Sequence, residues 1–421
     1  MYSKTLLSDI AREQLEEVRR REDFVVREKL AQTKSYSGMA ALVIKGVRRC
    51  GKSTLLKQVM RSLFPDGFYY FNFDDDRILD FETRDFQTLM EAFVGTFGEK
   101  RVVFFDEIQN VRGWELFVNR LLREGYRVFL TGSNADLLSQ ELGTHMTGRH
   151  VDVELYPFSF REFLHAKKLA FEVKGFSTKE KAVLSKSFAE YMERGGMPEA
   201  IVFSNDAMLS QVVNDIIQKD ILRRYRVGKP NEFRSILRFL LNNVGNKLSF
   251  RSVSSSFGVS SPNTVQKYIE YAEETYLVFT VNRFDMKIKR FEKNAKKIYC
   301  VDNGIVAKNS LTAIQNRGAL LENLVAVEFK RRGRQFYYYV NKNGSETDFI
   351  TVQNNAFHAV QVCVDPINPV TMEREQNALV STMKELKLKK GTFITMDYEE
   401  IKILKGMTIE FIPAWKWLLE N

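Results

Sequence analysis

The stretch GVRRCGKST, residues 46–54, is the feature that most constrains how this chain can fold. It follows the apolar run Ala40–Ile44, which is typical of a buried strand, and it precedes a helical pattern over Ser53–Leu63. The spacing is G-x-x-x-x-G-K-[ST], in which the glycines let the backbone wrap a phosphate chain with its N–H groups pointing inward. Average residue usage gives on the order of 0.01–0.02 chance matches in a chain of this length. We therefore predict a strand, a phosphate-binding loop and a helix, and not an ordinary glycine-rich turn.

The residues of this loop have different expected roles. Lys52 is expected to reach the β- and γ-phosphates, and the Ser53 hydroxyl is expected to bind Mg²⁺. The helix that follows would add the positive end of its dipole. The loop therefore predicts ATP and Mg²⁺ as ligands. The residues expected to bind the nucleotide are Gly46, Val47, Arg48, Arg49, Cys50, Gly51, Lys52, Ser53 and Thr54.

A second strand supplies the acidic residues that such a loop needs. In RVVFFDEIQNV, the apolar run Val102–Phe105 is typical of a strand buried on both faces of a parallel sheet. It ends in Asp106 and Glu107, about 55 residues after the loop, and ligands bind at the carboxyl ends of such strands. A solvated strand cap is the alternative for this pair. We expect Asp106 to bind Mg²⁺ and Glu107 to orient and deprotonate the attacking water.

Two further strands are expected, and each ends in polar residues. The strand Val128–Thr131 is followed by Ser133 and Asn134, either of which would sense the γ-phosphate or cap the next helix, and both roles can hold together. The strand Phe68–Phe73 is followed by three aspartates at positions 74–76. These aspartates fit a structural cap and a place near the site equally well.

The composition limits the class of protein. At 421 residues the chain should hold two or three domains, and 44% hydrophobic and 12% aromatic content is enough for packed cores. Three scattered cysteines, no apolar stretch that could span a bilayer and no secretory signal predict a cytoplasmic protein without a membrane partner. The net charge of +10 fits a nucleic-acid partner, but many basic proteins bind none, and some of this charge would serve ATP.

Five segments together resemble one known family. They are VIKGVRRCGKSTLL, YFNFDDDR, VVFFDEIQNV, FLTGSNADLLSQEL and TGRHVDVELYPFSFREF. In this order they resemble the AAA-type ATPases of bacteria and archaea that carry a C-terminal domain of unknown function, and the resemblance covers nearly the whole chain. It implies that Arg149, the arginine of the fifth segment's GR pair, contacts the γ-phosphate. An ordinary salt bridge is the alternative for Arg149.

The segment RGGMPEA, residues 194–200, resembles the GG-x-P element of related switch ATPases. In those proteins a loop of the helical lid presses on the nucleotide. The resemblance implies that Pro198 lies against adenine or ribose. A Gly-Gly helix terminator with a proline nearby would explain the same residues.

The middle of the chain has the pattern of a small helical module. FRSILRFLLNNVG is a helix by its period, and the next segment predicts a helix, a turn at Gly258, a helix from Ser261 and a strand, which is the outline of a winged helix-turn-helix. Winged helices also serve as ATPase lids and protein-docking modules, so DNA contact stays open here. The second helix would offer these residues to a major groove: Ser261, Asn263, Thr264, Gln266 and Lys267.

The C-terminal part has the outline of a PD-(D/E)xK nuclease, and the resemblance implies a similar fold. Glu322 on a helix, Asp348 on a strand and Gln361 on the next fit this outline. The lysine position holds Cys363, and a thiol cannot supply the positive charge that helps to deprotonate water. We expect a degenerate nuclease fold kept for nucleic-acid or protein binding. A lysine from elsewhere, such as Lys342, is the alternative that would restore cleavage.

We therefore expect an α/β protein built on a P-loop parallel sheet. Its predicted parts are an AAA-type ATPase domain at 1–165, a helical lid at 166–228, a winged-helix-like module at 229–290 and a restriction-endonuclease-like domain at 291–421. The predicted function is that of a Mg²⁺-dependent ATPase, with Lys52, Glu107 and Arg149 as catalytic residues, acting as a switch or remodeller on DNA or a DNA-associated complex. The alternatives are an ATP-gated switch for a protein partner and an ATP-regulated nuclease. The sequence leaves a monomer and a ring equally open.

Overall fold

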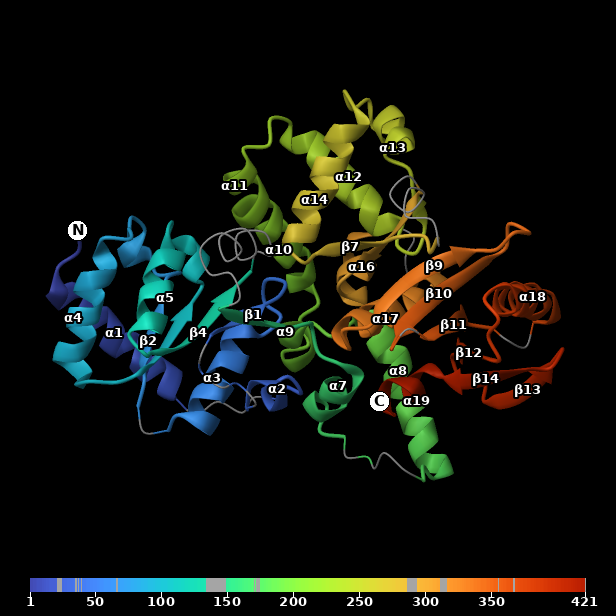
Figure 1. Ribbon diagram of the computed structural model, residues 1–421, viewed down its shortest axis with the longest axis horizontal. Helices are drawn as coiled ribbons and strands as arrows, with labels where there is room; N and C mark the ends of the chain where they lie inside the picture. Colours follow the sequence, from blue (N-terminus) through green and yellow to red (C-terminus); the bar gives the residue numbers. More distant parts are fainter. Residues whose placement is uncertain are drawn as a thin grey trace. The chain divides into compact units, whose positions relative to one another are not determined.

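The computed structural model shows two compact units (Figure 1). The first comprises residues 1–156 with 274–276, and the second comprises residues 157–273 with 277–421. No helix in the described part of the chain combines the length and the apolar character needed to cross a bilayer. The residues that the structure describes are 1–20, 25–34, 36, 38, 40–65, 67–133, 149–169, 171, 175–285, 294–310, 316–354, 356–365 and 368–420.

The first unit is built on a five-stranded parallel sheet with the order β2-β3-β4-β1-β5. Four of its strands are expected from their apolar runs, and the observed limits differ from the expected ones by at most one residue. The fifth, β5, is an edge strand whose side chains are mostly exposed, so it has no such run. The strands are β1 (Ala41–Lys45), β2 (Tyr69–Asn72), β3 (Val102–Asp106), β4 (Arg127–Gly132) and β5 (His150–Glu154).

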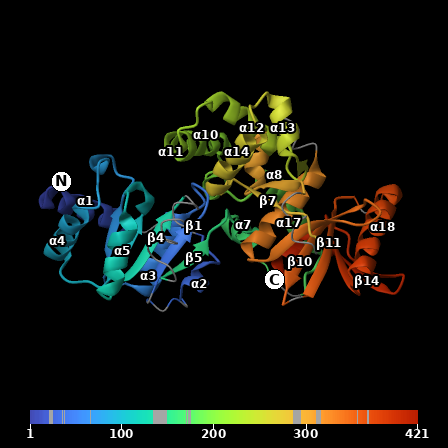
Figure 2. The same cartoon turned by 45° about the horizontal axis from the view of Figure 1, so that its top comes forward.

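Helices cover both faces of this sheet (Figure 2). One face presents alternate strand residues, such as Val43, Phe71 and Phe105, to a core shared with α1, α4 and α5. The other face presents Phe104 and Phe129, which pack against Phe64 at the end of α3. The helices and helical turns of this unit are α1 (Lys4–Arg19), α2 (Leu30–Lys34), α3 (Lys52–Leu63), η1 (Asp76–Ile78), α4 (Asp85–Phe97), η2 (Ile108–Asn110) and α5 (Trp114–Arg123).

The second unit starts with helices and continues into a small three-stranded sheet. The antiparallel sheet has the order β6-β8-β7, and the expected turn glycine, Gly258, ends α13 with φ 63°. The helices and the strand expected from residues 231–284 are therefore present. The helices are α7 (Phe160–Ala166), α8 (Thr178–Arg194), α9 (Pro198–Val202), α10 (Ala207–Asp215), the π-helical η3 (Ile216–Leu222), α11 (Arg223–Tyr225), α12 (Pro230–Asn242), α13 (Phe250–Phe257) and α14 (Pro262–Glu274), and the strands are β6 (Lys247–Leu248), β7 (Val278–Val281) and β8 (Lys296–Cys300).

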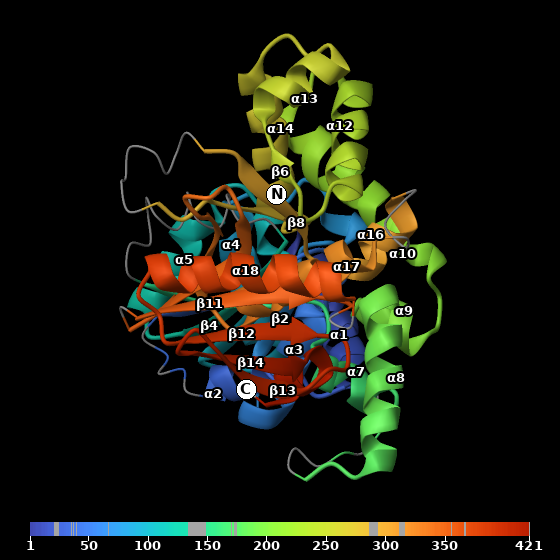
Figure 3. The same cartoon turned by 90° about the vertical axis from the view of Figure 1, so that its right-hand side faces the viewer.

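A six-stranded mixed sheet completes the second unit. Its order is β13-β14-β12-β11-β10-β9, with β11, β12 and β14 parallel and the other pairs antiparallel. Helix α18 lies along one face of this sheet (Figure 3), and α17 and α19 pack on the other. The elements are α16 (Asn303–Asn309), α17 (Arg317–Arg331), β9 (Gln335–Val340), β10 (Glu346–Gln353), β11 (Ala356–Cys363), α18 (Pro369–Glu385), β12 (Lys390–Thr395), β13 (Glu400–Leu404), β14 (Met407–Pro413) and α19 (Ala414–Leu419).

The two units do not follow the four expected parts. The first unit ends at Tyr156, ahead of the limit at 165, because α7 packs with the second unit: Phe160 and Phe163 contact Tyr191 of α8. The expected lid, helical module and C-terminal domain share one compact unit. The four-part division therefore stays a prediction.

Candidate functional site

The loop after β1 has the backbone that its two glycines permit. A Cβ at Gly46 would lie 2.1 Å from the backbone oxygen of Leu155, so no side chain fits there. Gly51 has φ 97° and precedes the first residue of α3. Both values of φ at these glycines are positive, and only glycine adopts such conformations at low cost. The loop geometry thus requires the two glycines of the sequence pattern.

The start of α3 is suited to an anion. Because its N-cap is Gly51, no side chain caps the N–H groups of the first turn, and they carry the positive end of the helix dipole. Lys52, the first residue of α3, is buried, and its Nζ donates to the backbone oxygens of Gly46 at 3.1 Å and Val47 at 3.2 Å. The partly exposed Ser53 and Thr54 follow in the same turn. A phosphate chain wrapped by this loop would meet the uncapped N–H groups and Lys52.

The acidic pair lies at the carboxyl end of β3, on the sheet edge from which the loop also leaves β1. Asp106 is buried, its Oδ1 accepts a hydrogen bond from the Thr131 hydroxyl, and its Oδ2 accepts one from the Tyr70 hydroxyl at 3.4 Å. Glu107 has a left-handed φ of 53°, and its Oε1 lies 4.0 Å from Nζ of Lys52. The structure therefore brings the expected lysine and the expected base together.

The surroundings of Glu107 favour a carboxylate that accepts a proton. Burial raises the pKa of its carboxyl group above the usual range, and the Asp106 charge adds to this, while Lys52 and a hydrogen bond from Gln109 act in the opposite direction. A raised pKa brings a carboxylate closer to the value at which it can accept a proton near neutral pH. Gln109 donates to Oε2 of Glu107 and lies 3.5 Å from Oγ of Ser133. Ser133 is thus linked to Glu107 through Gln109, whereas Asn134 lies outside the described residues.

Two side chains of this unit hold the loop in place without a recognisable sequence signal. Arg27 is 3% exposed, and its guanidinium donates to the backbone oxygens of Cys50 at 2.7 Å and Tyr156 at 2.6 Å. It therefore ties the loop to the segment that follows β5. The Cys50 thiol donates to the backbone oxygen of Leu155 at 3.4 Å, and burial raises its pKa, so it acts as a packing residue of the loop.

One of the three aspartates after β2 has a structural role. Asp75 caps the turn η1 by accepting from the backbone N–H of Arg77 and forms an ion pair with its guanidinium at 2.8 Å. Hydrogen bonds from Arg77 lower the pKa of Asp75 to about 2. Of the two roles left open for this segment, the structure shows a cap at Asp75.

The structure does not bring Arg149 to the phosphate loop. Arg149 comes directly before β5, and the register pairs Ala41 with His150 at the start of β1 and β5. The loop leaves the other end of β1, about 16 Å away at 3.3 Å per residue. Nη1 of Arg149 donates instead to Oδ1 of Asn119 at 3.0 Å. Arg149 thus lies at the amino end of β5, and its role at a γ-phosphate stays a prediction.

The RGG segment lies in the second unit and is held by a buried carboxylate. Gly195 ends α8 with φ 71°, and a Cβ there would lie 2.2 Å from Oδ1 of Asp302. The backbone N–H of Gly196 donates to Oδ2 of Asp302 at 2.6 Å, and burial raises the pKa of Asp302 to about 6. Pro198 is the first residue of α9. These contacts fit the helix terminator, and the role of Pro198 at a nucleotide stays a prediction.

The expected nuclease residues meet around one lysine. Glu322 accepts from Nζ of Lys297 at 2.8 Å and from the hydroxyl of Tyr299 at 2.6 Å. Lys297 also lies 2.5 Å from Oε1 of Glu346 and 3.7 Å from Oδ1 of Asp348. We call Lys297, Glu322, Glu346 and Asp348 the Lys297 cluster. Burial acts to lower the pKa of Lys297, but the three carboxylates raise it well above the usual range, so this side chain is a cation.

The lysine in this cluster is not the one expected. Lys342 is exposed, and Lys297 of β8 lies among the acids instead. Gln361 accepts from the backbone N–H of Asp348 at 3.3 Å and donates to Glu375 at 2.6 Å, while burial raises the pKa of the Cys363 thiol to about 11. Within the described ranges no group of three or more His, Cys, Asp or Glu side chains is arranged to hold a metal ion. The Lys297 ammonium group therefore compensates the charge that a metal would compensate in a nuclease.

Three parts of the chain match known families. Residues 39–164 match a family described as AAA domain. Residues 185–317 match a domain of unknown function, DUF8612, and residues 317–417 match another, DUF4143.

Among the relatives that match most of the chain are two uncharacterized proteins. The uncharacterized protein MJ1544 of Methanocaldococcus jannaschii is 33% identical over 394 residues, which is 90% of this chain and 88% of the relative. An uncharacterized protein of Haemophilus influenzae is 31% identical over 393 residues, which is 89% of this chain and 93% of the relative. Among solved structures, the S. cerevisiae Hsp104-ADP complex is 15% identical with a TM-score of 0.30, and the match covers 78% of this chain and 46% of that one.

Proposed function

The chain belongs to the same family as MJ1544, and we propose that it is a Mg²⁺-dependent ATPase whose nucleotide state acts as a switch. The match to an AAA domain implies nucleotide binding, typically with Mg²⁺. One observation carries the proposal further to hydrolysis. Lys52 of the phosphate loop and Glu107 of the acidic pair lie within 4.0 Å of each other at one edge of a parallel sheet.

The residues present fit a magnesium nucleotide. Ser53 at the start of α3 and Asp106 at the end of β3 would hold Mg²⁺, which usually binds one or two protein oxygens together with phosphate oxygens. When bound, the ion neutralises charge on the phosphates. The uncapped N–H groups of α3 would bind the phosphate chain.

The contacts of Lys52 and Glu107 suggest how each would act. Lys52 is held by the backbone oxygens of Gly46 and Val47, and we infer that it exchanges these acceptors for phosphate oxygens when a nucleotide binds. Glu107 would accept the proton of the attacking water, because burial raises its pKa. Gln109 orients the carboxylate of Glu107 and contacts Ser133 at the end of the next strand. Through this link, a change at the γ-phosphate would reach β4.

We propose DNA as the partner on which the switch acts. The chain carries a net charge of +10, and α14 exposes Asn263, Gln266 and Lys267 in a helix-turn-helix order of elements. The small antiparallel sheet β6-β8-β7 and the helices α12, α13 and α14 support a winged-helix interpretation of this module. The Lys297 cluster does not favour a nuclease, because an ammonium group already compensates its carboxylates.

ATP turnover by the purified full chain tests this proposal. It would be measured with and without duplex and single-stranded DNA at two salt concentrations, and the DNA would then be run on a gel. We expect turnover that DNA stimulates and salt suppresses, with the DNA left intact, because phosphate contacts weaken as salt rises. Turnover that is indifferent to DNA would favour a protein partner, and metal-dependent cutting that Asp348→Ala abolishes would favour a nuclease.

The variant Lys52→Ala serves as the control for the phosphate loop. Removing its ammonium group should weaken ATP binding at least 100-fold and abolish turnover, because Lys52 supplies the charge that contacts the phosphates. Isothermal titration with ATP and Mg²⁺ measures the affinity. An unchanged affinity would refute the phosphate-loop assignment.

A further inference from the structure

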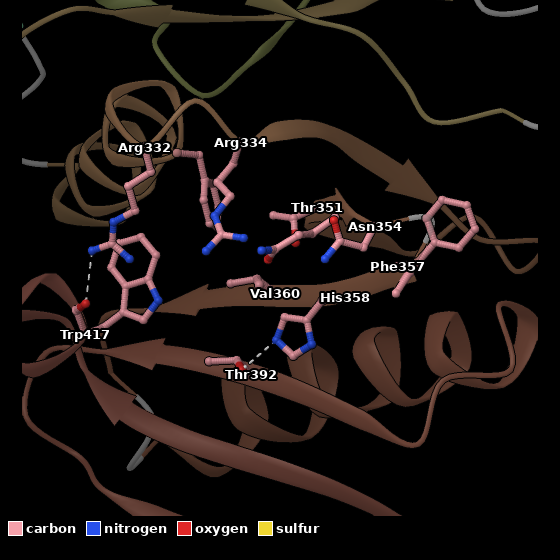
Figure 4. A pocket seen from close by; sticks show the side chains of 12 residues that line it. Arg332, Arg334, Thr351, Asn354, Phe357, His358, Val360, Thr392 and Trp417 are labelled. Atoms are coloured by element: carbon pink, nitrogen blue, oxygen red, sulfur yellow. Dashed lines mark hydrogen bonds between the residues drawn. The ribbon is translucent and has the colours of Figure 1, made fainter. Parts of the chain in front are cut away.

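A pocket of about 500 Å³ opens on one face of the mixed sheet in the second unit (Figure 4). Its floor comes from β10, β11 and β12, and its rim comes from the end of α17 and from α19. Pockets of about 300–1,000 Å³ are the usual size for small-molecule sites. The pocket lies away from the Lys297 cluster: Gln361 points from β11 to Glu375 of α18, whereas its neighbour Val360 lines the pocket on the opposite face.

The end of α17 places two arginines at the rim. Gly333 follows the helix with φ 64°, its N–H donates to the backbone oxygen of Lys330, and the N–H of Arg334 donates to the backbone oxygen of Phe329. This pair of hydrogen bonds is the Schellman arrangement, which fixes the chain direction at a helix end. Arg332 and Arg334 stand on either side of Gly333. Figure 4 shows the side chain of Arg334 pointing from the rim over the strands of the floor.

The two arginines differ in how their charges are compensated. Arg332 donates to Glu328 at 2.7 Å and to the backbone oxygen of Trp417 at 3.1 Å, and its guanidinium lies 4.3 Å from the Trp417 ring centre. For the side chain of Arg334, the described part of the chain offers neither an ion pair nor a hydrogen bond. Among the described residues that line the pocket there is no Asp or Glu. Arg334 is therefore a cation that faces a pocket without a compensating carboxylate.

The floor carries neutral hydrogen-bonding groups in fixed positions. Thr351 pairs with His358 across β10 and β11, and the His358 Nε2 lies 2.9 Å from Oγ1 of Thr392 on β12. Burial lowers the pKa of His358, which favours the neutral form of its imidazole. The side-chain amides of Gln353 and Asn354 add donors and acceptors at one end of the pocket. Hydroxyl, imidazole and amide groups donate and accept hydrogen bonds, as the hydroxyls of a sugar and the edge of a base require.

We propose that this pocket binds a nucleotide unit, with its phosphate on Arg334 and its sugar and base over the strand floor. A guanidinium binds phosphate through two parallel hydrogen bonds, which favours phosphate over other small anions. The amides of Gln353 and Asn354 suit the donor and acceptor pattern of a base edge, and Phe357 and Trp417 border the pocket with aromatic surface. The pocket volume admits about one such unit. The unit is either a free nucleotide or one nucleotide of a single strand.

The test uses the full chain with Lys52→Ala, so that the phosphate loop does not compete for the probes. AMP, inorganic phosphate and a fluorescent ten-residue oligo(dT) are titrated separately, by calorimetry for the first two and by anisotropy for the third. Arg334→Ala should weaken binding of AMP or of the oligonucleotide at least tenfold, because a charge-assisted contact to phosphate is lost. Arg123→Ala, which removes an exposed arginine of α5 in the other unit, should leave binding unchanged.

Each result of these titrations either supports the proposal or overturns it. Binding of AMP that depends on Arg334 identifies a free nucleotide as the source, and binding of the oligonucleotide alone identifies a single strand. Inorganic phosphate binding as tightly as AMP would overturn the proposal, because the sugar and base would then contribute nothing. Equal binding by Arg334→Ala, or no binding of AMP and the oligonucleotide, would also overturn it. The single variant Arg334→Ala, in which Lys52 is intact, should keep wild-type ATP turnover. This result shows that the variant folds, and it separates this test from the ATPase proposal.

Discussion

Replacing Lys297 tests the electrostatics of the second unit. Lys297 is 3% exposed in its side chain, and it contacts Glu322 at 2.8 Å, Glu346 at 2.5 Å and Asp348 at 3.7 Å. At 4 Å and an effective dielectric constant of 20, one unit-charge pair attracts by about 4 kcal/mol, and the desolvation of the charges offsets much of this sum. Removing one partner of a buried pair costs about 3–5 kcal/mol, because the other charges stay buried without compensation. We expect Lys297→Met to lower the free energy of unfolding of this unit by about that amount.

The loss of stability in Lys297→Met should depend on pH. Burial and the charge of Glu322 raise the pKa of Asp348, whereas Lys297 holds it down. Without Lys297 the folded-state pKa of Asp348 rises further above its unfolded value. Stability from such groups is present at low pH and is lost as the pH rises through the folded-state pKa. The destabilisation caused by Lys297→Met should therefore be smaller at pH 5 than at pH 7.

Urea unfolding followed by tryptophan fluorescence measures the effect. Trp415 and Trp417 both lie in α19 of the second unit, so their emission reports on that unit alongside Trp114 of the first. The matched control is Lys296→Met, which makes the same charge change one residue earlier in β8, at a lysine that forms no ion pair with a carboxylate of the described residues. A loss below about 1 kcal/mol relative to this control, or an equal loss at both pH values, would refute the electrostatic account.

Three further predictions concern the nucleotide site and its output. Glu107→Gln should keep ATP affinity within about threefold and lower turnover by about 10²–10⁴-fold, as expected for a lost general base, and undiminished steady-state turnover would remove Glu107 from that role. Arg149→Ala should leave turnover of the dilute chain within about twofold, because Arg149 lies at the sheet edge opposite the loop, and a large loss would contradict that placement. Spin labels can be placed at Lys267 and Glu373 of the Glu107→Gln variant, because both residues are exposed. The distance between the labels, measured by double electron–electron resonance, should be the same with and without ATP. A change of several ångströms would show that the second unit does not move as one body.

The sequence is enough to place the phosphate loop and the acidic pair together, because their signals are local. The loop and the acidic pair each follow a continuous apolar run, and the carboxyl ends of parallel strands meet at one edge, so Lys52 and Glu107 come together without further information. Arg27 escapes this reasoning because it contacts Cys50 and Tyr156, which are 23 and 129 residues away. The place of Arg149 in the sheet escapes it for a related reason. A motif gives the order of residues along β5. Only the pairing of β5 with β1 shows which end of β5 lies beside the loop.

The expected limit at residue 290 separates elements that the structure joins. Strand β8 comes after this limit, yet it pairs with β6 and β7 before it, so the small sheet crosses the expected boundary. The same strand contributes Lys297 to the carboxylates of α17 and β10, and the side-chain amide of Asn323 in α17 bonds both backbone groups of Cys300. Lys247 of β6 adds a second ion pair to Glu346 at 2.5 Å. A movement that separated the helical module from the mixed sheet would have to break this buried network, so the second unit should respond to nucleotide as a single body.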